Sequence, residues 1–225
     1  MAPAIAAGLP RRAEAGAPDA AHGAARWSQL LVDAGLPEDW ISVVTDSGKE
    51  AGGPLAEHAV PAVVTFTGSA PVGWAIAAAA PRKRVLLELG SNSPLLVQPD
   101  ADLDGLATRI AKGGFGFAGQ SCISIQRLLV HEDVHDELVE AVASAADELV
   151  VGDPLDETTD VGPLIKPREI DRVRDVGRRA TVARGRARVV TGGARRTSGI
   201  LRPTVVDERH AAPTAICAGK RCSGP

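Results

Sequence analysis

The sequence has no tyrosine and only three Trp and three Phe among its 225 residues. An aromatic content of 3% disfavours a stacking platform for single-stranded nucleic acid. The three cysteines (Cys122, Cys217 and Cys222) form an odd set without framework spacing, which suits a reducing compartment. The first residues lack the basic and apolar regions of a signal peptide, and no apolar run reaches the roughly 20 residues of a membrane span. We therefore expect a soluble, cytoplasmic protein.

The residues that are present indicate an ordinary globular chain. Hydrophobic residues make up 44% and charged residues 24% of the sequence. A formal net charge of −3 argues against nucleic acid or an anionic membrane as the main partner. The length allows one large domain or two small ones, with enough residues to bury a core.

Short β-branched or apolar runs alternate with helical patterns from residue 28 onward. Strands are expected at residues 41–44, 60–66, 84–89, 94–97, 128–130, 189–190 and 204–206. Helices are expected at residues 28–34, 71–80, about 100–113, 134–149 and 167 to about 183. Residues 1–26 show no steady period. The alternation predicts an α/β fold with parallel sheet, in which strands 84–89 and 94–97, apolar on both faces, are buried.

The run Phe66-Thr67-Gly68-Ser69 ends a predicted strand where a helix follows. Such a turn presents backbone N–H groups to an anion such as a pyrophosphate, although an ordinary strand-to-helix turn has the same residues. Gly68 and Gly73 form neither the G-x-G-x-x-G fingerprint nor a P-loop.

Cys122 and Glu88 are the candidate catalytic residues. Cys122 follows Gly119-Gln120 in a loop, where nearby N–H dipoles can activate a thiol; the alternative is a buried structural cysteine. Glu88 lies in the apolar strand Val85-Leu-Leu-Glu-Leu89, where burial of a carboxylate costs free energy unless it is paired or neutral. Its alternative is a strand-end glutamate that faces solvent.

No metal site is expected from the histidine and cysteine spacing. His131 and His135 are four residues apart but do not belong to an H-E-x-x-H motif. Cys217 and Cys222 have a spacing unlike that of a zinc knuckle. The arginine-rich stretch 172–188 is interpreted as a solvated surface, mostly one helix face.

Taken together, the motifs resemble the aldehyde dehydrogenase superfamily over about residues 30–207. The matching segments, in the order of that family, are Ala34-Gly-Leu-Pro, Phe66-Thr-Gly-Ser with Val72-Gly73, Leu87-Glu-Leu-Gly, Asp100-Ala-Asp-Leu-Asp, Gly119-Gln-Ser-Cys, Val151-Gly-Asp-Pro-Leu and Val161-Gly-Pro-Leu-Ile. Leu89-Gly-Ser-Asn-Ser-Pro and the segment from Gln120 to Arg127 look most like the branch that acts on lactaldehyde-type and phosphonoacetaldehyde-type substrates.

The resemblance implies oxidation of a small aldehyde to its acid with NAD or NADP. Cys122 would be the nucleophile, its backbone N–H would help to hold the oxyanion, and Glu88 would activate the hydrolytic water. The cofactor-binding residues implied are Thr67, Gly68, Ser69 and Val72 near the pyrophosphate turn, and Leu89 and Gly90 beside the nicotinamide.

The resemblance also implies an incomplete version of the family's fold. Residues 27–89 would be part of a Rossmann-type dinucleotide-binding domain, and residues 90–207 part of an α/β catalytic domain. The upstream oxyanion-hole asparagine is missing. Members of the family are homo-oligomers, whereas this chain lacks the late bridging strands, and an open sheet edge would favour aggregation.

The two flanks suggest a frameshifted gene. With suitable codons, residues 12–24 read one base later spell the family motif Val-Leu-Lys-Pro-Ala-Pro, and residues 218–224 read two bases later spell Arg-Glu-Glu-Val-Phe-Gly-Pro. We hypothesise that residues from about 9 to 26 and from about 208 to 225 are out of frame. The family's cofactor-contacting lysine is then replaced by Glu14. Codons that do not spell these motifs would refute the hypothesis.

Three functions therefore remain open from the sequence. The first is an NAD(P)-dependent aldehyde dehydrogenase with Cys122 and Glu88 as its chemical pair. The second is a catalytically inactive fragment or pseudoenzyme of that family. The third is a cofactor-independent cysteine esterase that uses the same thioester, which leaves the Thr67-Gly68-Ser69 turn unexplained.

Overall fold

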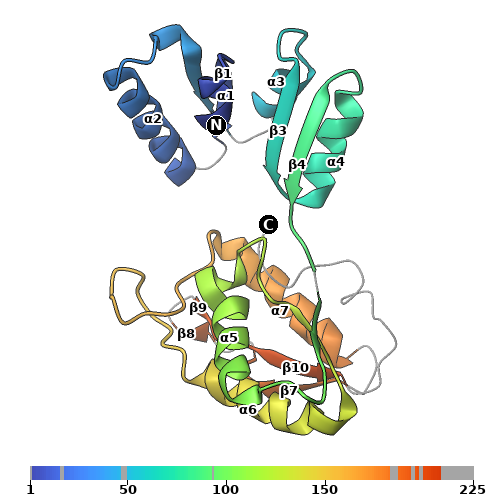
Figure 1. Ribbon diagram of the computed structural model, residues 1–225. Coiled ribbons are helices and arrows are strands. Elements are labelled where there is room, and N and C mark those ends of the chain that lie inside the picture. The colour runs from blue at the N-terminus through green and yellow to red at the C-terminus, as the bar shows by residue number, and fades with distance from the viewer. Residues whose placement is uncertain are drawn as a thin grey trace. The chain divides into compact units, whose positions relative to one another are not determined.

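The computed structural model describes residues 2–15, 18–46, 50–92, 94–182, 187–193, 196–197 and 200–208. The chain forms two compact units, residues 1–88 and 89–225, which we call unit 1 and unit 2. Residues 209–225, including Cys217 and Cys222, lie outside the described part. Strands in the described part pair two by two (Figure 1).

Unit 1 alternates helices and strands, with β4 running to its boundary with unit 2. Its elements are α1 (Ala2–Ala6), β1 (Arg11–Ala15), α2 (Pro18–Asp33), η1 (Glu38–Trp40), β2 (Ile41–Thr45), α3 (Gly52–Glu57), β3 (Val63–Gly68), α4 (Ala70–Ala79) and β4 (Arg84–Leu89).

The first part of unit 1 is a parallel strand pair with one helix packed on it. β1 pairs with β2 from Arg11 opposite Ile41 to Ala15 opposite Thr45, and α2 packs against both strands. The expectation that the helix begins at Ser28, after an irregular segment, is wrong. Alanine has the highest intrinsic helix propensity, so the Ala-rich segment forms helix without an apolar period, and Pro18 suits a first helical turn.

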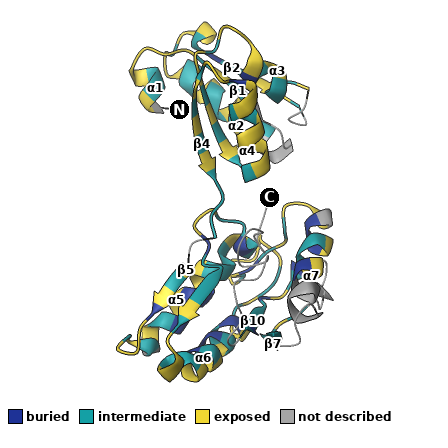
Figure 2. Cartoon of the chain, turned by 90° about the vertical axis from the view of Figure 1, so that its right-hand side faces the viewer, coloured by how far each residue is buried: buried dark blue, intermediate teal, exposed yellow. Residues whose placement is uncertain are grey.

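In the second part of unit 1, α4 covers one face of the β3–β4 pair. The backbone N–H of Arg84 donates to the carbonyl of Ala62 at 3.3 Å, so the two strands start side by side and run in the same direction (Figure 1). Residues of both strands alternate between exposed and half-buried, and Leu86 is 53% exposed. The prediction that strand 84–89 is buried on both faces is therefore wrong: every second residue of β4 is exposed, and no described element of unit 1 covers that face (Figure 2).

Unit 2 contains the larger set of elements. They are β5 (Pro94–Val97), α5 (Leu103–Phe115), η2 (Gly116–Gly119), β6 (Arg127–Val130), η3 (Glu132–Val134), α6 (His135–Asp147), α7 (Pro167–Val182), β7 (Ala187–Thr191), β8 (Arg196–Thr197), β9 (Ile200–Leu201) and β10 (Val205–Glu208).

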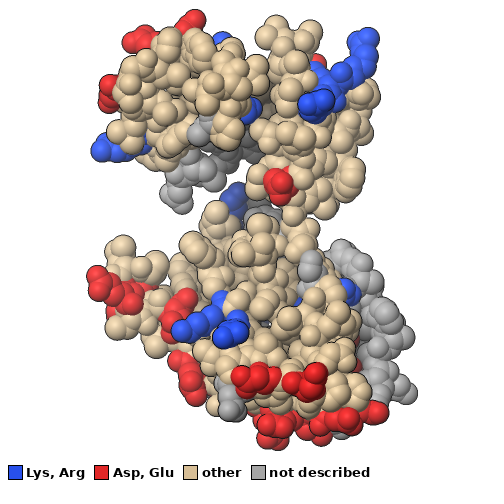
Figure 3. Space-filling view, in the orientation of Figure 1, with Lys and Arg blue, Asp and Glu red and all other residues tan. Residues whose placement is uncertain are grey.

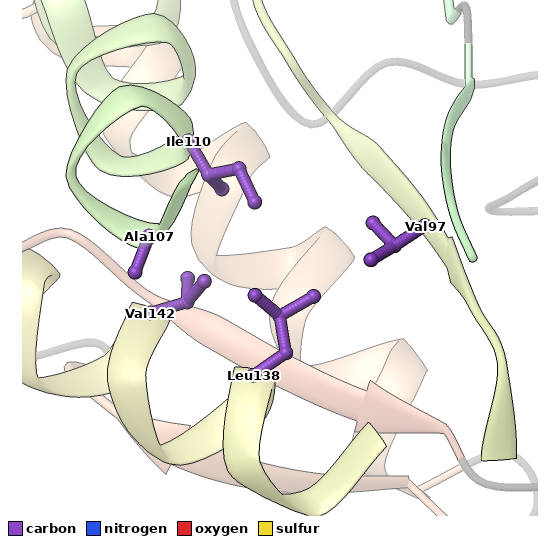
Figure 4. Packing of buried hydrophobic residues seen from close by; sticks show 5 residues of the cluster. All are labelled: Val97, Ala107, Ile110, Leu138 and Val142. Atoms are coloured by element: carbon purple, nitrogen blue, oxygen red, sulfur yellow. The ribbon is translucent and has the colours of Figure 1, made fainter. Parts of the chain in front are cut away.

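The core of unit 2 lies between the β5–β6 pair and the helices α5 and α6. The two strands are parallel, as predicted, with Val97 opposite Val130. Figure 4 shows side chains from one strand and both helices converging; they are Val97, Ala107, Ile110, Leu138 and Val142. Leu138 is fully buried, and burial of one such leucine contributes about 1.5–3 kcal/mol.

The late strands differ from the predicted parallel sheet. β10 pairs with β7 in antiparallel orientation, and both strands pack against α6, while α7 packs against β7. The small antiparallel pair β8–β9 lies between the two strands in the chain. Antiparallel neighbours need no crossover helix, and none of the described residues between β7 and β10 is helical.

Acidic side chains gather over the end of unit 2 that carries η3 and α6 (Figure 3). Glu132 and Asp133 belong to η3, and Asp136 and Glu137 to the first turn of α6. Negative charge at this end of a helix interacts favourably with the helix dipole. No helix in the described ranges combines the length and apolarity needed to cross a membrane.

Candidate active site

The Cys122 thiol is free and exposed on a turn in unit 2 that follows α5 and η2. It is not the buried structural cysteine considered as an alternative. Just upstream, Phe117, Ala118 and Gly119 have left-handed φ angles of 53°, 55° and 74°. Glycine adopts this region freely, whereas each non-glycine residue costs about 1–2 kcal/mol. The backbone before the thiol is therefore held in a conformation that the surrounding structure must stabilise.

One set of contacts ties the downstream side of the turn to α5. The Ser124 hydroxyl donates to the carbonyl of Gly114 at 2.9 Å, and the backbone N–H of Ile125 donates to the carbonyl of Gly113 at 3.1 Å. A Cβ atom at Gly113 would lie 2.8 Å from the Ile125 side chain. The two glycines thus allow the chain after Cys122 to approach the helix closely.

Gln120 ties the upstream side of the turn to a second loop. Its amide nitrogen donates to the carbonyl of Phe117 at 2.9 Å, and its amide oxygen accepts from the backbone N–H of Ile165 at 2.9 Å. Ile165 ends the motif that begins at Val161, and Val161 forms a parallel bridge to Val151. Two motifs separated in sequence are in this way joined to each other and to the cysteine turn.

Ser91 contacts Cys122, the residue predicted to be the nucleophile. Its hydroxyl donates to the backbone carbonyl of Cys122 at 2.8 Å. Ser91 and Cys122 are 31 residues apart in the chain. The sequence interpretation did not assign Ser91 a role, because its position in Leu89-Gly-Ser-Asn-Ser-Pro gives no information on what its hydroxyl contacts.

Glu88 lies in β4, one residue before the end of the strand, and its side chain is exposed. Glu88 is therefore the strand-end glutamate facing solvent that was considered as its alternative, and burial gives no reason to assign it a special role. Glu88 belongs to unit 1 and Cys122 to unit 2.

The predicted phosphate turn lies at the C-terminal end of β3, where α4 begins. Ser69 has extended backbone angles before the helix, Pro71 occupies the first turn, and the N–H of Gly73 donates to the Ser69 carbonyl at 3.0 Å. Thr67 and Val72 are exposed. A Cβ atom at Gly68 would lie 2.6 Å from the ring of Phe66, so glycine keeps this turn tight.

The same turn fits a dinucleotide in one respect. The first N–H groups of α4 have no acceptor within the helix and carry partial positive charge, which is the arrangement that binds phosphate oxygens. Leu89 is the last residue of β4, and Gly90 follows it; both are half-buried.

His131 and His135 make structural contacts in unit 2. The Nδ1 atom of His131 accepts from the backbone N–H of Asp133 at 3.3 Å at the start of η3. His135 contacts Asp136 and the buried Asp207, and Asp207 also binds Arg188. No group of three or more metal-ligating side chains occurs within the ranges that the structure describes.

Arg188 and Asp207 are residues whose role the sequence interpretation missed. Arg188 was included in an exposed arginine-rich helix face, but it lies in β7, beyond the end of α7. Asp207 is the one buried residue of β10, and the other three residues of that strand are half-buried. The strand sequence Val-Val-Asp-Glu has no alternation of apolar and polar residues that could have indicated this burial.

A sequence profile of the Aldehyde dehydrogenase family matches residues 1–218. The chain belongs to the aldehyde dehydrogenase family. The 3-sulfolactaldehyde dehydrogenase of Priestia aryabhattai is 39% identical over 183 residues, which are 81% of this chain and 38% of that protein. The vanillin dehydrogenase of Corynebacterium glutamicum is 40% identical over 152 residues, 66% of this chain and 31% of that protein.

Solved structures of the family show the same fold. Aldehyde dehydrogenase C from Pseudomonas syringae, complexed with NAD+ and octanal, matches with a TM-score of 0.89 and 34% identity. The match covers 100% of this chain and 47% of that one. The glyceraldehyde-3-phosphate dehydrogenase GapN from Methanocaldococcus jannaschii, complexed with NADP, matches with a TM-score of 0.84 and 33% identity over 92% of this chain and 45% of that one.

These matches confirm two predictions from the sequence, the family and the α/β fold that covers part of its relatives' structure. The chain spans less than half the length of these four relatives. The match to the Pseudomonas syringae structure covers all of this chain, and with it the Thr67-Gly68-Ser69 turn, Glu88 and Cys122.

Proposed function

We propose that the chemistry of this chain is NAD(P)-dependent oxidation of a small aldehyde, with Cys122 as nucleophile. The observation that carries the proposal is the Cys122 turn: an exposed thiol on a backbone anchored to α5, to Ile165 and to Ser91. Holding a nucleophile in one place beside its substrate lowers the activation barrier of the reaction, by up to several kcal/mol.

In the proposed first step, the Cys122 thiolate attacks the aldehyde carbon and forms a carbon–sulfur bond. The carbonyl electron pair moves onto oxygen, and the backbone N–H of Cys122 donates a hydrogen bond to that oxyanion. A bound NAD(P)+ would supply the hydride acceptor that oxidation of this carbon to the thioester level requires. The acyl group then stays attached to the Cys122 sulfur.

In the second step, Glu88 removes a proton from a water molecule, which attacks the thioester carbonyl. The carbon–sulfur bond breaks, the carboxylic acid leaves, and the Cys122 thiolate is restored. General-base assistance of this kind typically accelerates such a step by about 10²–10⁴-fold. A general base for hydrolysis must contact a water molecule, and Glu88 is exposed to solvent in unit 1.

The cofactor-binding residues of the proposal are those at the two strand ends. The α4 N-terminus with Thr67, Gly68 and Ser69 would bind the pyrophosphate, and Val72 would contact the cofactor from the first turn of that helix. Leu89 and Gly90 would line the nicotinamide side. Residues 27–89 are then part of the dinucleotide-binding domain and residues 90–207 part of the catalytic domain. Relatives with solved structures bind NAD+ or NADP, so we leave both dinucleotides in the proposal.

The substrate class that we propose is a small aldehyde. The motif segments around Gly90 and Cys122 resemble the lactaldehyde-type and phosphonoacetaldehyde-type branch, and one relative at 39% identity is named for 3-sulfolactaldehyde. Other relatives carry names of aromatic aldehydes, such as vanillin, so the choice of aldehyde is tested rather than assumed.

The second candidate is a catalytically inactive fragment, which has part of the family's fold but does not oxidise aldehydes. The observation that favours it is the span: the chain covers 47% of the Pseudomonas syringae structure, and its β3–β4 face is uncovered.

One experiment separates these functions. The purified chain is incubated with lactaldehyde or vanillin and NAD+ or NADP+, and in parallel with p-nitrophenyl acetate. NAD(P)H formation that is lost in Cys122→Ala supports the dehydrogenase. Ester cleavage alone, lost in the same variant, supports the cysteine esterase. Silence in both assays, from a chain that shows cooperative unfolding, supports the inactive fragment and refutes the dehydrogenase.

A further inference from the structure

We propose that Ser91 is a positioning residue that holds the Cys122 turn in its reactive geometry. The proposal rests on the proposed role of Cys122 as nucleophile. Its basis is the 2.8 Å hydrogen bond from the Ser91 hydroxyl to the Cys122 carbonyl oxygen, within unit 2.

The other anchors of the turn act on its sides. Gln120 ties the upstream side to Ile165, and Ser124 ties the downstream side to α5. The tip between them projects outward, since Ile123 is 84% exposed and Cys122 is exposed. At the tip, the backbone N–H of Ile123 has a long 3.4 Å contact to the Ser121 hydroxyl from within the turn itself. Ser91 supplies a contact to the tip from a distant part of the chain.

The atom that Ser91 holds determines the orientation of the nucleophile. A carbonyl oxygen fixed in direction fixes the plane of the Cys122–Ile123 peptide, because the peptide bond is planar. The rotation of that plane about the Cα–C bond of Cys122 is then set. With Gln120 anchored on the other side, the backbone is held before and after the Cys122 Cα, and this holds the Cα–Cβ bond that carries the thiol.

Ser91 lies close in sequence to other residues of the proposed site. Ser91 follows Glu88 by three residues and Gly90 by one. The segment that carries the proposed water-activating base and the proposed nicotinamide contacts therefore also carries the hydroxyl that anchors the nucleophile. Ser91 does not touch the reacting atoms, so its effect on the reaction acts through Cys122.

The test compares Ser91→Ala, Ser91→Thr and a matched control, Ser28→Ala. Ser28 also donates its hydroxyl to a backbone carbonyl, that of Ala25 at 2.9 Å, but it lies on α2 in unit 1. A positioning role predicts that Ser91→Ala lowers kcat for aldehyde oxidation by about 5–10-fold, as expected for one hydrogen bond worth about 1–1.4 kcal/mol in the transition state. KM should change less than about twofold, because Ser91 does not bind substrate.

Ser91→Thr retains the hydroxyl and should keep at least about half of kcat, and Ser28→Ala should match the unaltered chain. The direct readout is the carbon-13 resonance of the Cys122 carbonyl, which moves upfield when an accepted hydrogen bond is lost. It should move in Ser91→Ala and remain in place in Ser91→Thr and Ser28→Ala. A carbonyl resonance that is the same in all four proteins overturns the hydrogen bond.

A kcat that is unchanged in Ser91→Ala while the resonance moves overturns the positioning role. Equal losses of kcat in Ser91→Ala and Ser28→Ala overturn it as well, since they indicate general damage. If the unaltered chain oxidises no aldehyde, the proposed function fails, and the carbonyl resonance still decides whether Ser91 holds Cys122.

Discussion

The Nε2 atom of His135 on α6 lies 3.2 Å from the Oδ1 atom of Asp207 on β10, although the two residues are 72 positions apart. The second oxygen of Asp207 accepts from the Nε atom of Arg188 on β7 at 3.0 Å. The Asp207 side chain is 6% exposed. A carboxylate so deeply buried is stable only when its oxygens are bonded, and these two partners connect the β7–β10 pair to α6.

Loss of this carboxylate should loosen the pair of strands from the helix. We expect Asp207→Ala to lower the free energy of unfolding by about 1.5–3 kcal/mol, the range for hydrogen bonds to a charged group. The measurement is urea-induced unfolding followed by circular dichroism. The control is Asp171→Ala, which removes an exposed ion pair to Arg174 at 3.7 Å and should change stability by less than about 0.5 kcal/mol. Equal effects of the two substitutions would contradict a special role for Asp207.

Replacement of Glu88 by glutamine should separate the two chemical steps. Glutamine cannot accept a proton from water, so Glu88→Gln should leave the first turnover of NAD(P)H formation in place and slow later turnovers by about 10²–10⁴-fold. Stopped-flow absorbance at the nicotinamide band measures both phases. Glu57→Gln, at an exposed position in α3 of the same unit, is the control and should leave both unchanged. A Glu88→Gln protein with unaltered steady-state turnover would remove Glu88 from the mechanism.

The outer face of the β5–β6 pair should drive self-association. Leu96 and Leu129 are register partners and are 65% and 49% exposed. Contiguous apolar surface of this kind favours association in water. Leu96→Lys should therefore shift the sedimentation profile toward the monomer, with a change in unfolding free energy below about 0.5 kcal/mol.

The contrast to Leu96 is Leu138, which is fully buried on α6. Leu138→Ala should cost about 2–5 kcal/mol through lost burial and a cavity, and should not reduce association. An unchanged association state in Leu96→Lys would show that another surface is responsible.

The carboxyl group of Asp156 should have a pKa below the usual range for an aspartate. Hydrogen bonds from the backbone N–H and then the hydroxyl of Thr158 lower the pKa of Asp156 from its ordinary value of 3.8. A lowered folded-state pKa means that the ionised form stabilises the turn above the unfolded pKa. That contribution is lost as the pH falls from about 4 through the folded-state pKa.

The check is a carboxyl NMR titration. Thr158→Val removes the hydroxyl but keeps the backbone N–H, so the pKa of Asp156 should move only part of the way back to 3.8. Thr159→Val, which leaves both bonds to Asp156 in place, serves as the control. A titration midpoint of Asp156 that is the same in Thr158→Val as in the unaltered chain would show that the hydroxyl does not contribute.

Local patterns predicted most elements of the fold. The strands at residues 84–89 and 94–97 have the predicted bounds, and the helices at 71–80 and 167–183 begin or end within a residue of them. These elements depend on β-branched runs, on Pro71 in a first turn and on acidic helix starts, all of which are interactions between near neighbours. The first ten residues of α2, 18–27, were missed because an Ala-rich segment has helix propensity without an apolar period. β1 was missed because Arg11–Ala15 contains no β-branched or aromatic residue.

By itself, the sequence determined the family and the portion of its fold, because motif residues such as those around Cys122 and Glu88 are adjacent in the chain. Only the tertiary structure decided which strand faces are covered, and so whether Glu88 is buried or exposed. It also decided that Ser91 reaches the Cys122 carbonyl and that Asp207 lies between His135 and Arg188. Each of these pairs joins residues far apart in sequence, and such contacts follow from packing of whole elements rather than from any local pattern.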